Sequence, residues 1–197
     1  MYNNWNVDLS DSVEALEKIK HDVLPKLVSG KIHSIEKSQK DIMIKFGKEI
    51  DTQNPILKLL DIKSGIDYIR EDSNGLQGIA SRVQWGEKAW NSFTIRHERH
   101  TGAETEYQKR LKQIRNGYFY PAFTLQAYFD NRTDNNLLSV AVIRTTDLYK
   151  FAEQYQNYVR QNKSDNVFKI VFWSDLIQKG YSLKCIPKYN ISDKKTA

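Results

Sequence analysis

The chain of 197 residues contains one cysteine, Cys185, and four histidines. A single cysteine excludes a disulfide within the chain and any zinc site that needs several cysteines. Cys185 lies in the alternating run SLKCIP, which is typical of a half-buried strand. His97 and His100 are three residues apart but fall at a predicted strand end and in the turn after it, so we expect no metal site built from histidines.

Long apolar runs are also missing, and none approaches the roughly 20 residues that a membrane-spanning helix needs. The opening residues, MYNNWNVDLSD, lack the basic and then apolar pattern of a secretory signal peptide. We therefore expect a cytoplasmic protein with no membrane partner. The chain also lacks the P-loop, GxGxxG, GxSxG and HExxH signatures, which leaves a small-molecule enzyme without support.

The composition is that of a folded, basic protein. Hydrophobic residues make up 40% of the chain and aromatic residues 12%, which is enough for a packed core. The length suits one globular domain, which we expect to span residues 1–190 and to be followed by a frayed tail at 191–197. An excess of 30 Lys and Arg over 24 Asp and Glu gives a net charge of +6. This charge favours an anionic partner, most commonly nucleic acid.

Residues 66–99 hold the polar side chains of greatest interest. They read as three strands, IDYIRE, LQGIASRVQW and SFTIRHER, separated by the turn DSNG and by a loop around Gly86. Side chains two residues apart in a strand share a face. If the three strands form a meander, one face carries five polar side chains, which are Asp67, Arg82, Gln84, Thr94 and Arg96.

Two interpretations of this polar face stay open. Antiparallel sheets commonly expose one polar face with cross-strand charge pairs, and these residues fit that description. They also fit a site that holds phosphate, with or without a metal. The planar fork of arginine matches phosphate oxygens, and an aspartate can hold a cation.

A helix is predicted directly after these strands. Thr101 and Glu104 have the spacing of a capping box, and Gly117 marks the stop after about Asn116. Tyr107, Leu111 and Ile114 form the expected inward stripe, and the remaining positions are polar and include Lys109, Arg110 and Lys112. The basic residues either form local ion pairs with Glu106 or project toward a nucleic-acid backbone.

The other elements are read from apolar periodicity. A first helix begins near Asp11 and ends or kinks at Leu24, before Pro25. A basic segment at about 30–54 forms either a short helix and then a strand or one longer helix, and Pro55 opens a short helix that Gly65 closes. The later elements are the strands FTLQAYF and LLSVAVIR, a helix capped by Thr145 or Thr146 that reaches Val159, and a final pair of strands, NVFKIVFW and YSLKCIP. This mixture predicts an α/β or α+β fold with a mixed central sheet flanked by helices.

One stretch resembles a known family. Gly65-Ile66-Asp67 opens a strand, and a turn, further strands and a helix follow, which is similar to the core of the PD-(D/E)XK (restriction-endonuclease-like) nuclease superfamily. There an Asp and a downstream (Glu or Gln)-x-Lys hold a divalent metal and activate water. Asp67 matches the first motif. The second motif departs, because the chain has Ala80-Ser81-Arg82, or Arg82-Val83-Gln84 two residues later, with no lysine on the polar face. The similarity covers about residues 60–130.

The resemblance implies a metal-dependent nuclease, a hydrolase that cleaves phosphodiester bonds in DNA or RNA. In the mechanism it implies, Asp67 and Gln84 hold Mg²⁺, which polarises the phosphate and activates water. Arg82 or Arg96 offsets the negative charge that builds on the phosphorane. The expected catalytic residues are therefore Asp67, Arg82, Gln84 and Arg96, and the expected nucleic-acid contacts are Lys109, Arg110 and Lys112. An alternative is a non-catalytic basic protein that binds nucleic acid or a nucleic-acid-processing enzyme.

Overall fold

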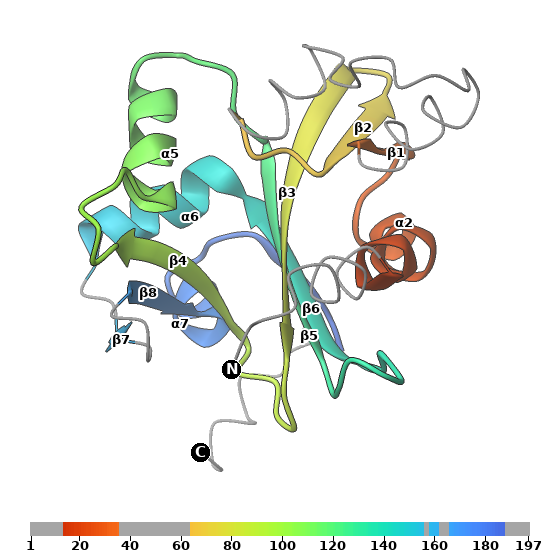
Figure 1. Cartoon of the computed structure of the whole chain (residues 1–197). Helices are drawn as coiled ribbons and strands as arrows, with labels where there is room; N and C mark the ends of the chain where they lie inside the picture. The colour runs from red at the N-terminus through yellow and green to blue at the C-terminus, as the bar shows by residue number, and fades with distance from the viewer. Residues whose placement is uncertain (1–13, 36–63, 156–157, 162–165, 188–197) are drawn as a thin grey trace, which may run out of the picture.

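The computed structural model describes residues 14–35, 64–155, 158–161 and 166–187 of the chain. In these ranges the strands form two sheets (Figure 1). The larger sheet has the strand order β1 (Lys31–Ser34), β2 (Tyr68–Asp72), β3 (Gly75–Trp85), β5 (Phe123–Phe129), β6 (Leu137–Arg144) and β9 (Leu183–Ile186). The smaller sheet has the order β4 (Ser92–Glu98), β8 (Val167–Phe172) and β7 (Tyr158–Gln161).

The larger sheet is mixed, which confirms the predicted fold class. Strands β1, β2 and β3 are antiparallel to one another, and β6 is antiparallel to both β5 and β9. The pair β3 and β5 is parallel, with Arg82 beside Gln126. Parallel neighbours need a crossover connection, and here β4 and helix α5 (Glu106–Arg115) supply it.

The predicted meander of three strands is wrong in its third member. Strands β2 and β3 form the expected hairpin, but β4 pairs with β8 in the smaller sheet. The place beside β3 belongs to β5, in which Leu125 and Ala127 are fully buried. A strand buried on both faces belongs in the middle of a sheet, whereas β4 has polar residues at alternate positions and lies outside it.

Residues 14–27 are helical and cover one face of the larger sheet. A π-helical turn at Ile19–Val23 (η1) leads into helix α2 (Leu24–Leu27), which has Pro25 in its first turn. The helix therefore continues past Leu24, the residue at which we expected it to end or kink, although the change from π to α hydrogen bonding falls there. The predicted helix start at residues 11–13 lies outside the described residues.

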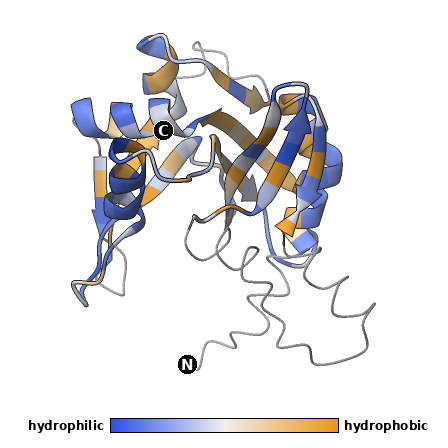
Figure 2. Ribbon diagram, turned by 90° about the horizontal axis from the view of Figure 1, so that it is seen from above, coloured by the Kyte–Doolittle hydropathy of each residue, from blue (hydrophilic) through white to orange (hydrophobic). Residues whose placement is uncertain are grey.

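Helix α6 (Thr145–Gln154) covers the other face and joins the two sheets. Its Leu148 and Phe151 belong to one apolar cluster with Ile143 of the larger sheet and with Phe93 and Val171 of the smaller one. Hydrophobic residues run along the strands in the middle of the molecule, and the outer helices show hydrophilic residues (Figure 2). Burial against α6 thus holds the smaller sheet next to β3 and β5.

The helix ends differ from several predictions. Helix α5 begins at Glu106, because Thr105 and Gln108 form the capping box that we assigned to Thr101 and Glu104. Its predicted stop is confirmed, since Gly117 has a φ of +66°, a conformation that favours glycine. The predicted caps of α6 are wrong, because Arg144 precedes the helix and Thr145 is the first helical residue. The hydroxyl of Thr145 forms a hydrogen bond with the hydroxyl of Thr124 instead of capping the helix.

Two further predictions are corrected near the C-terminus. Val159, predicted to lie on the helix, belongs to strand β7. The two last strands are not a pair, because β8 joins the smaller sheet, β9 joins β6, and helix α7 (Trp173–Gln178) separates them. Cys185 is half-buried on β9, as expected.

Only the beginning of the basic segment at 30–54 is described. It forms strand β1, so neither predicted version, both of which begin with a helix, holds for residues 31–34. The predicted short helix at 55–64 and the tail at 191–197 lie outside the described ranges, apart from Ser64. No helix in the described part of the chain has both the length and the apolar character needed to cross a membrane.

Candidate functional site

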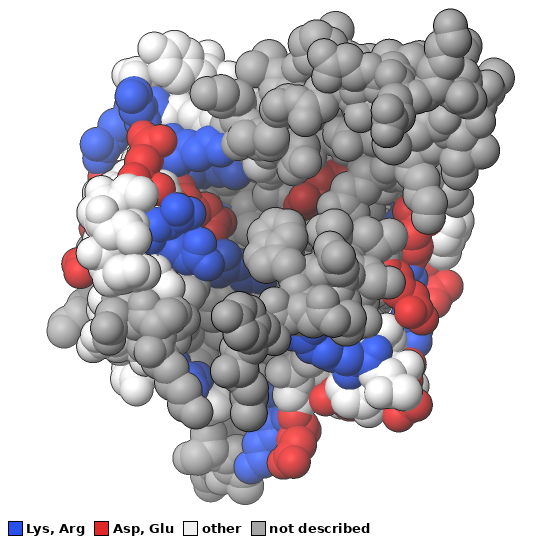
Figure 3. All heavy atoms as spheres, in the orientation of Figure 1, with Lys and Arg blue, Asp and Glu red and all other residues white. Residues whose placement is uncertain are grey.

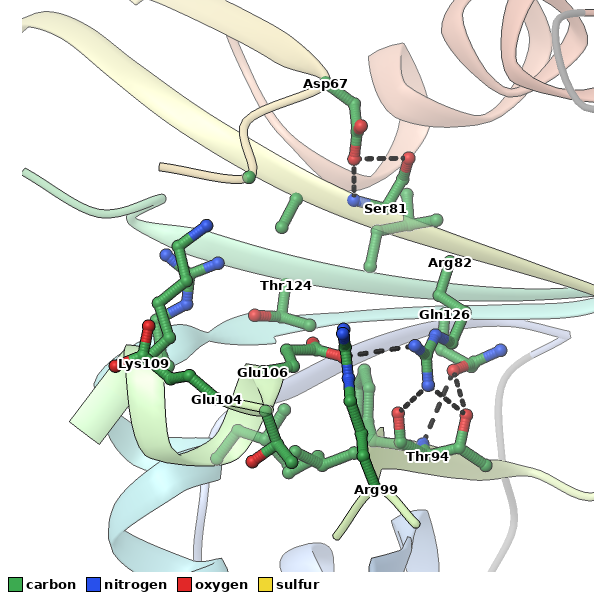
Figure 4. A pocket seen from close by; sticks show the side chains of 18 residues that line it. Asp67, Ser81, Arg82, Thr94, Arg99, Glu104, Glu106, Lys109, Thr124 and Gln126 are labelled. Atoms are coloured by element: carbon green, nitrogen blue, oxygen red, sulfur yellow. Dashed lines mark hydrogen bonds and ion pairs between the residues drawn. The ribbon is translucent and has the colours of Figure 1, made fainter. Parts of the chain in front are cut away.

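A cavity of about 490 Å³ lies between the larger sheet, strand β4 and helix α5 (Figure 4). We call it the β3–α5 cavity. Its wall includes four cationic side chains, Arg82, Arg99, Lys109 and Arg110, and three carboxylates, Asp67, Glu104 and Glu106. Ser81, Thr94, Thr105, Thr124 and Gln126 add hydroxyl and amide groups. The cavity is therefore polar, with one more cationic than anionic side chain.

The departure of β4 from the larger sheet creates this cavity. Arg82 on β3 and Gln126 on β5 are adjacent in the parallel pair, so their side chains project from the same face of the larger sheet. Strand β4 crosses in front of this face instead of joining its edge, and polar side chains bridge the space. Gln126, only 1% exposed, accepts hydrogen bonds from the backbone N–H and the hydroxyl of Thr94.

Arg82 ties three elements together. Its guanidinium donates to the carbonyl oxygen of Thr94 on β4 at 2.7 Å and to Oε2 of Glu106 on α5 at 3.1 Å. Both side chains of the Arg82–Glu106 ion pair are partly exposed, so solvent weakens their attraction. The predicted charge pairs lay between neighbouring strands or within the helix that contains Glu106, whereas this pair joins β3 to α5. Both of its members form part of the cavity wall.

Asp67 lies one residue before β2 and also lines the cavity. Its backbone N–H donates to the carbonyl oxygen of Ile79, and its carboxylate accepts hydrogen bonds from the N–H and the hydroxyl of Ser81. The first position of the resembled motif therefore faces the middle residue of Ala80-Ser81-Arg82 on the neighbouring strand. These contacts fix the Asp67 carboxylate at the cavity wall (Figure 4).

Gln84 and Arg96 do not line the cavity. The side-chain amide of Gln84 donates to the hydroxyl of Thr94 at 3.2 Å. The guanidinium of Arg96 lies over the ring of Phe168, 5.6 Å from its centroid, and that of Arg82 lies 5.9 Å from the same centroid. The alternation of side chains along the strands predicted that these two arginines lie on the same side, and the structure does bring them together, although they belong to different sheets.

The expected metal ligands are not assembled around one point. Asp67 lines the cavity, whereas Gln84 lies outside it and uses its amide nitrogen on Thr94. In the described ranges, no group of three or more His, Cys, Asp or Glu side chains could hold a metal ion. Asp67 and Gln84 therefore do not form the ligand pair that the resemblance implies, and Mg²⁺ binding stays a prediction for this chain.

Arg96 lies close enough to Arg82 and Arg99 for their charges to act on it. Burial lowers the pKa of Arg96, and the nearby charges of Arg82 and Arg99 lower it further, while Glu106 raises it. The guanidinium of Arg99 makes no hydrogen bond or ion pair with any residue in the described part of the chain. Lys and Arg atoms gather on the surface over α5 and β4 (Figure 3). Like charges repel, so an anion bound beside Arg82, Arg96 and Arg99 would stabilise these three side chains.

The three basic residues predicted on α5 have different environments. Lys109 lines the cavity, and Lys112 is exposed outside it. Arg110 is 5% exposed and donates to the carbonyl oxygen of Ser64 and to the side chain of Gln113. The inward face of α5 is thus wider than predicted, because Arg110 is buried by its bond to the segment that leads into β2.

Sequence reasoning missed Arg99 and Gln126 in the cavity wall and Tyr149, which contacts Glu106 of that wall. Tyr149 on α6 is buried and donates to Oε1 of Glu106 at 3.3 Å. Burial and the charge of Glu106 hold the pKa of Tyr149 well above its usual value, so its hydroxyl stays a donor. Gln126 carried a usable signal, since it is a polar residue within the apolar strand FTLQAYF. Arg99 carried none, because it is the last residue of the predicted strand SFTIRHER and falls on the face opposite to Thr94 and Arg96.

The chain was also compared with protein-family models, with curated proteins and with solved structures, and none of the three comparisons found a match. The resemblance to the PD-(D/E)XK superfamily therefore stays a prediction.

Proposed function

We propose that this chain is a nucleic-acid-acting protein that holds a phosphate group of DNA or RNA in the β3–α5 cavity. The observation that carries the proposal is that Arg82 and Arg99 line this cavity with Arg96 close to both, while the guanidinium of Arg99 makes no hydrogen bond or ion pair with the described residues. Arginine presents a planar set of donors that matches phosphate oxygens. The net charge of +6 favours the same partner.

The cavity residues have distinct roles in this proposal. Arg99 contacts the phosphate, and Lys109 supplies a second positive charge from α5. Arg82, held by Thr94 and Glu106, contributes a fixed positive charge. Arg110 positions the segment before β2 through the carbonyl oxygen of Ser64. Such contacts fix the position of a nucleic acid without reading its sequence.

Binding without cleavage is the version that the geometry supports best. Asp67 and Gln84 are not assembled around one point, and the position of the motif lysine is occupied by an arginine that is already bonded to Thr94 and Glu106. The chain then belongs to the class of basic, non-catalytic binders, with a site that resembles that of a nuclease.

A metal-dependent nuclease is the second candidate, and the placement of Asp67 favours it. Apart from β4, which lies between β3 and α5 in the chain, the order of a helix, antiparallel β1, β2 and β3, helix α5 and parallel β5 agrees with the core order of the resembled superfamily. Asp67 lies directly before β2, and its carboxylate accepts a hydrogen bond from Ser81 at the cavity wall. Mg²⁺ bound there would polarise a phosphate and activate water. This chain's contribution would be the Asp67 carboxylate and the positive charge of Arg82.

Two assays test these candidates. The first measures binding of the full chain to mixed DNA and RNA fragments at low salt. We expect Arg99→Ala to weaken binding, and we expect no change in Lys184→Ala, which removes one exposed positive charge on β9. Equal affinities for the two variants would contradict the cavity as the phosphate site.

The second assay incubates the same fragments with Mg²⁺ or Mn²⁺. The leading proposal predicts no cleavage. Cleavage that is lost in Asp67→Asn would establish the nuclease instead, and cleavage that persists in this variant would remove Asp67 from the mechanism.

A further inference from the structure

One face of the smaller sheet carries arginines and aromatic residues in register. Arg96 on β4, Phe168 on β8 and Arg160 on β7 are direct cross-strand neighbours. The next row on this face contains Thr94, Ile170 and Tyr158. Residues opposite each other in neighbouring strands project to the same side of the sheet. We call these two rows the aromatic–arginine face.

The opposite face of the same sheet is buried where α6 packs against β4 and β8. Phe93, Ile95 and Val171 occupy the alternate positions of β4 and β8 and are at most 2% exposed in the cluster that contains α6. The aromatic–arginine face is the side that the helix leaves uncovered. On this face Thr94 bonds Arg82 and Gln126 of the larger sheet, whereas Tyr158 and Arg160 on β7 are exposed.

Large aromatic side chains are exposed on and beside this face. Tyr158 is 63% exposed. Trp90, in the loop before β4, is 60% exposed, and the guanidinium of Arg160 lies 5.6 Å from its ring centroid. Phe168 is half-buried under the guanidinium groups of Arg82 and Arg96. Aromatic rings and arginine groups thus alternate, which is the composition of surfaces that bind single-stranded nucleic acid.

Arg82 connects this face to the β3–α5 cavity. Its guanidinium lies over Phe168, and the same residue lines the cavity. The two rows of the face contain two arginines and no carboxylate. A polyanion whose phosphate lies in the cavity would therefore meet the positive charges of Arg96 and Arg160 on this face.

We propose that a single strand of nucleic acid runs from the cavity across the aromatic–arginine face, with bases stacked on Trp90 and Tyr158 and phosphates beside Arg96 and Arg160. This proposal rests on the proposed function and adds the class of ligand. A duplex cannot use the face in this way, because stacking inside the helix already covers the faces of its bases. The unpaired bases of a single strand have free faces that can stack on aromatic rings.

The test measures fluorescence anisotropy of a labelled oligonucleotide of mixed sequence, as a single strand and as a duplex of the same length, with the full chain. We expect the single strand to bind more tightly. Trp90→Ala and Tyr158→Ala should each weaken its binding by about five- to 150-fold, the range for loss of one base–aromatic stack. Trp90→Phe should keep most of the affinity, because it keeps a ring for stacking.

The matched control is Phe119→Ala, which removes a 59% exposed aromatic ring from the segment after α5, outside the smaller sheet. We expect it to bind like the unmodified chain. Circular dichroism of each variant verifies that it is folded.

The outcomes separate this inference from the proposed function. Loss of binding in Arg99→Ala, with unchanged binding in Trp90→Ala and Tyr158→Ala, would overturn the single-strand path and leave the phosphate site intact. Tighter binding of the duplex would also overturn the path. Absence of binding to either form at low salt would overturn both proposals, and the face would then be better assigned to a protein partner.

Discussion

The guanidinium of Arg82 lies 2.7 Å from the carbonyl oxygen of Thr94, and this bond joins β3 of the larger sheet to β4 of the smaller one. The same guanidinium pairs with Glu106 on α5. The Arg82 side chain therefore connects β3, β4 and α5, which all contribute to the wall of the β3–α5 cavity. Arg82 is in consequence both a structural bond between the sheets and a source of positive charge in the site.

Replacing Arg82 tests its structural role. We expect Arg82→Ala to lower the free energy of unfolding by about 1–2 kcal/mol, because it removes charge-assisted hydrogen bonds to Thr94 and Glu106 that are partly exposed to solvent. Urea denaturation measures this change. The control Lys184→Ala should change it by less than about 0.5 kcal/mol. Equal stabilities of the two variants would show that the bond to Thr94 contributes little.

Glu106 limits the positive charge of the cavity, because its carboxylate neutralises that of Arg82. We expect Glu106→Gln to bind single-stranded DNA about two- to tenfold more tightly at low salt, since the amide keeps a hydrogen-bond acceptor and removes the negative charge. Anisotropy titration measures the affinity. Glu153→Gln is the control, because Glu153 pairs with Arg115 outside the cavity. Weaker binding of Glu106→Gln would show that the carboxylate itself takes part in the interaction.

His97 gives a testable pH dependence. Burial and then the charge of Lys169 lower the pKa of His97 below its usual value of 6.5, while Glu98 raises it. The folded protein thus binds this proton less tightly than the unfolded chain, so stability falls as the pH drops below 6.5 toward the folded pKa.

The variant His97→Phe keeps the ring contact with Tyr107 and removes the titration. We expect the decline of unfolding free energy between pH 7 and 5, about the range in which histidine titrates, to become shallower in this variant. The exposed His100→Gln should keep the original slope. If unfolding free energy declined equally with falling pH in the unmodified chain and both variants, His97 would be excluded as the cause of the decline.

Much of the fold was predictable because its signals are local. The apolar runs at 123–129 and 137–144 predicted buried strands, and both are confirmed. Strand β4 was also predicted as a strand, but alternation does not state which strand it pairs with. Its partner β8 lies about 75 residues further along the chain, so the separate smaller sheet was missed.

The site was predictable only in part, for the same reason. Alternation along β3 placed Arg82 and Gln84 on one face, and both contact Thr94. The burial of Arg110 depends on the carbonyl oxygen of Ser64, 46 residues away, and a helical pattern contains no information about that contact. Arg99 enters the cavity only because β4 crosses in front of the larger sheet.

The central claim is that a phosphate lies beside Arg99 in the β3–α5 cavity. Its most direct test is the affinity for single-stranded DNA across a series of salt concentrations, for the unmodified chain, Arg99→Ala and Lys184→Ala. We expect the slope of log affinity against log salt to become shallower by about 0.7 in Arg99→Ala, which corresponds to one lost phosphate contact, and to stay unchanged in Lys184→Ala. Identical slopes for Arg99→Ala and the unmodified chain would contradict the claim.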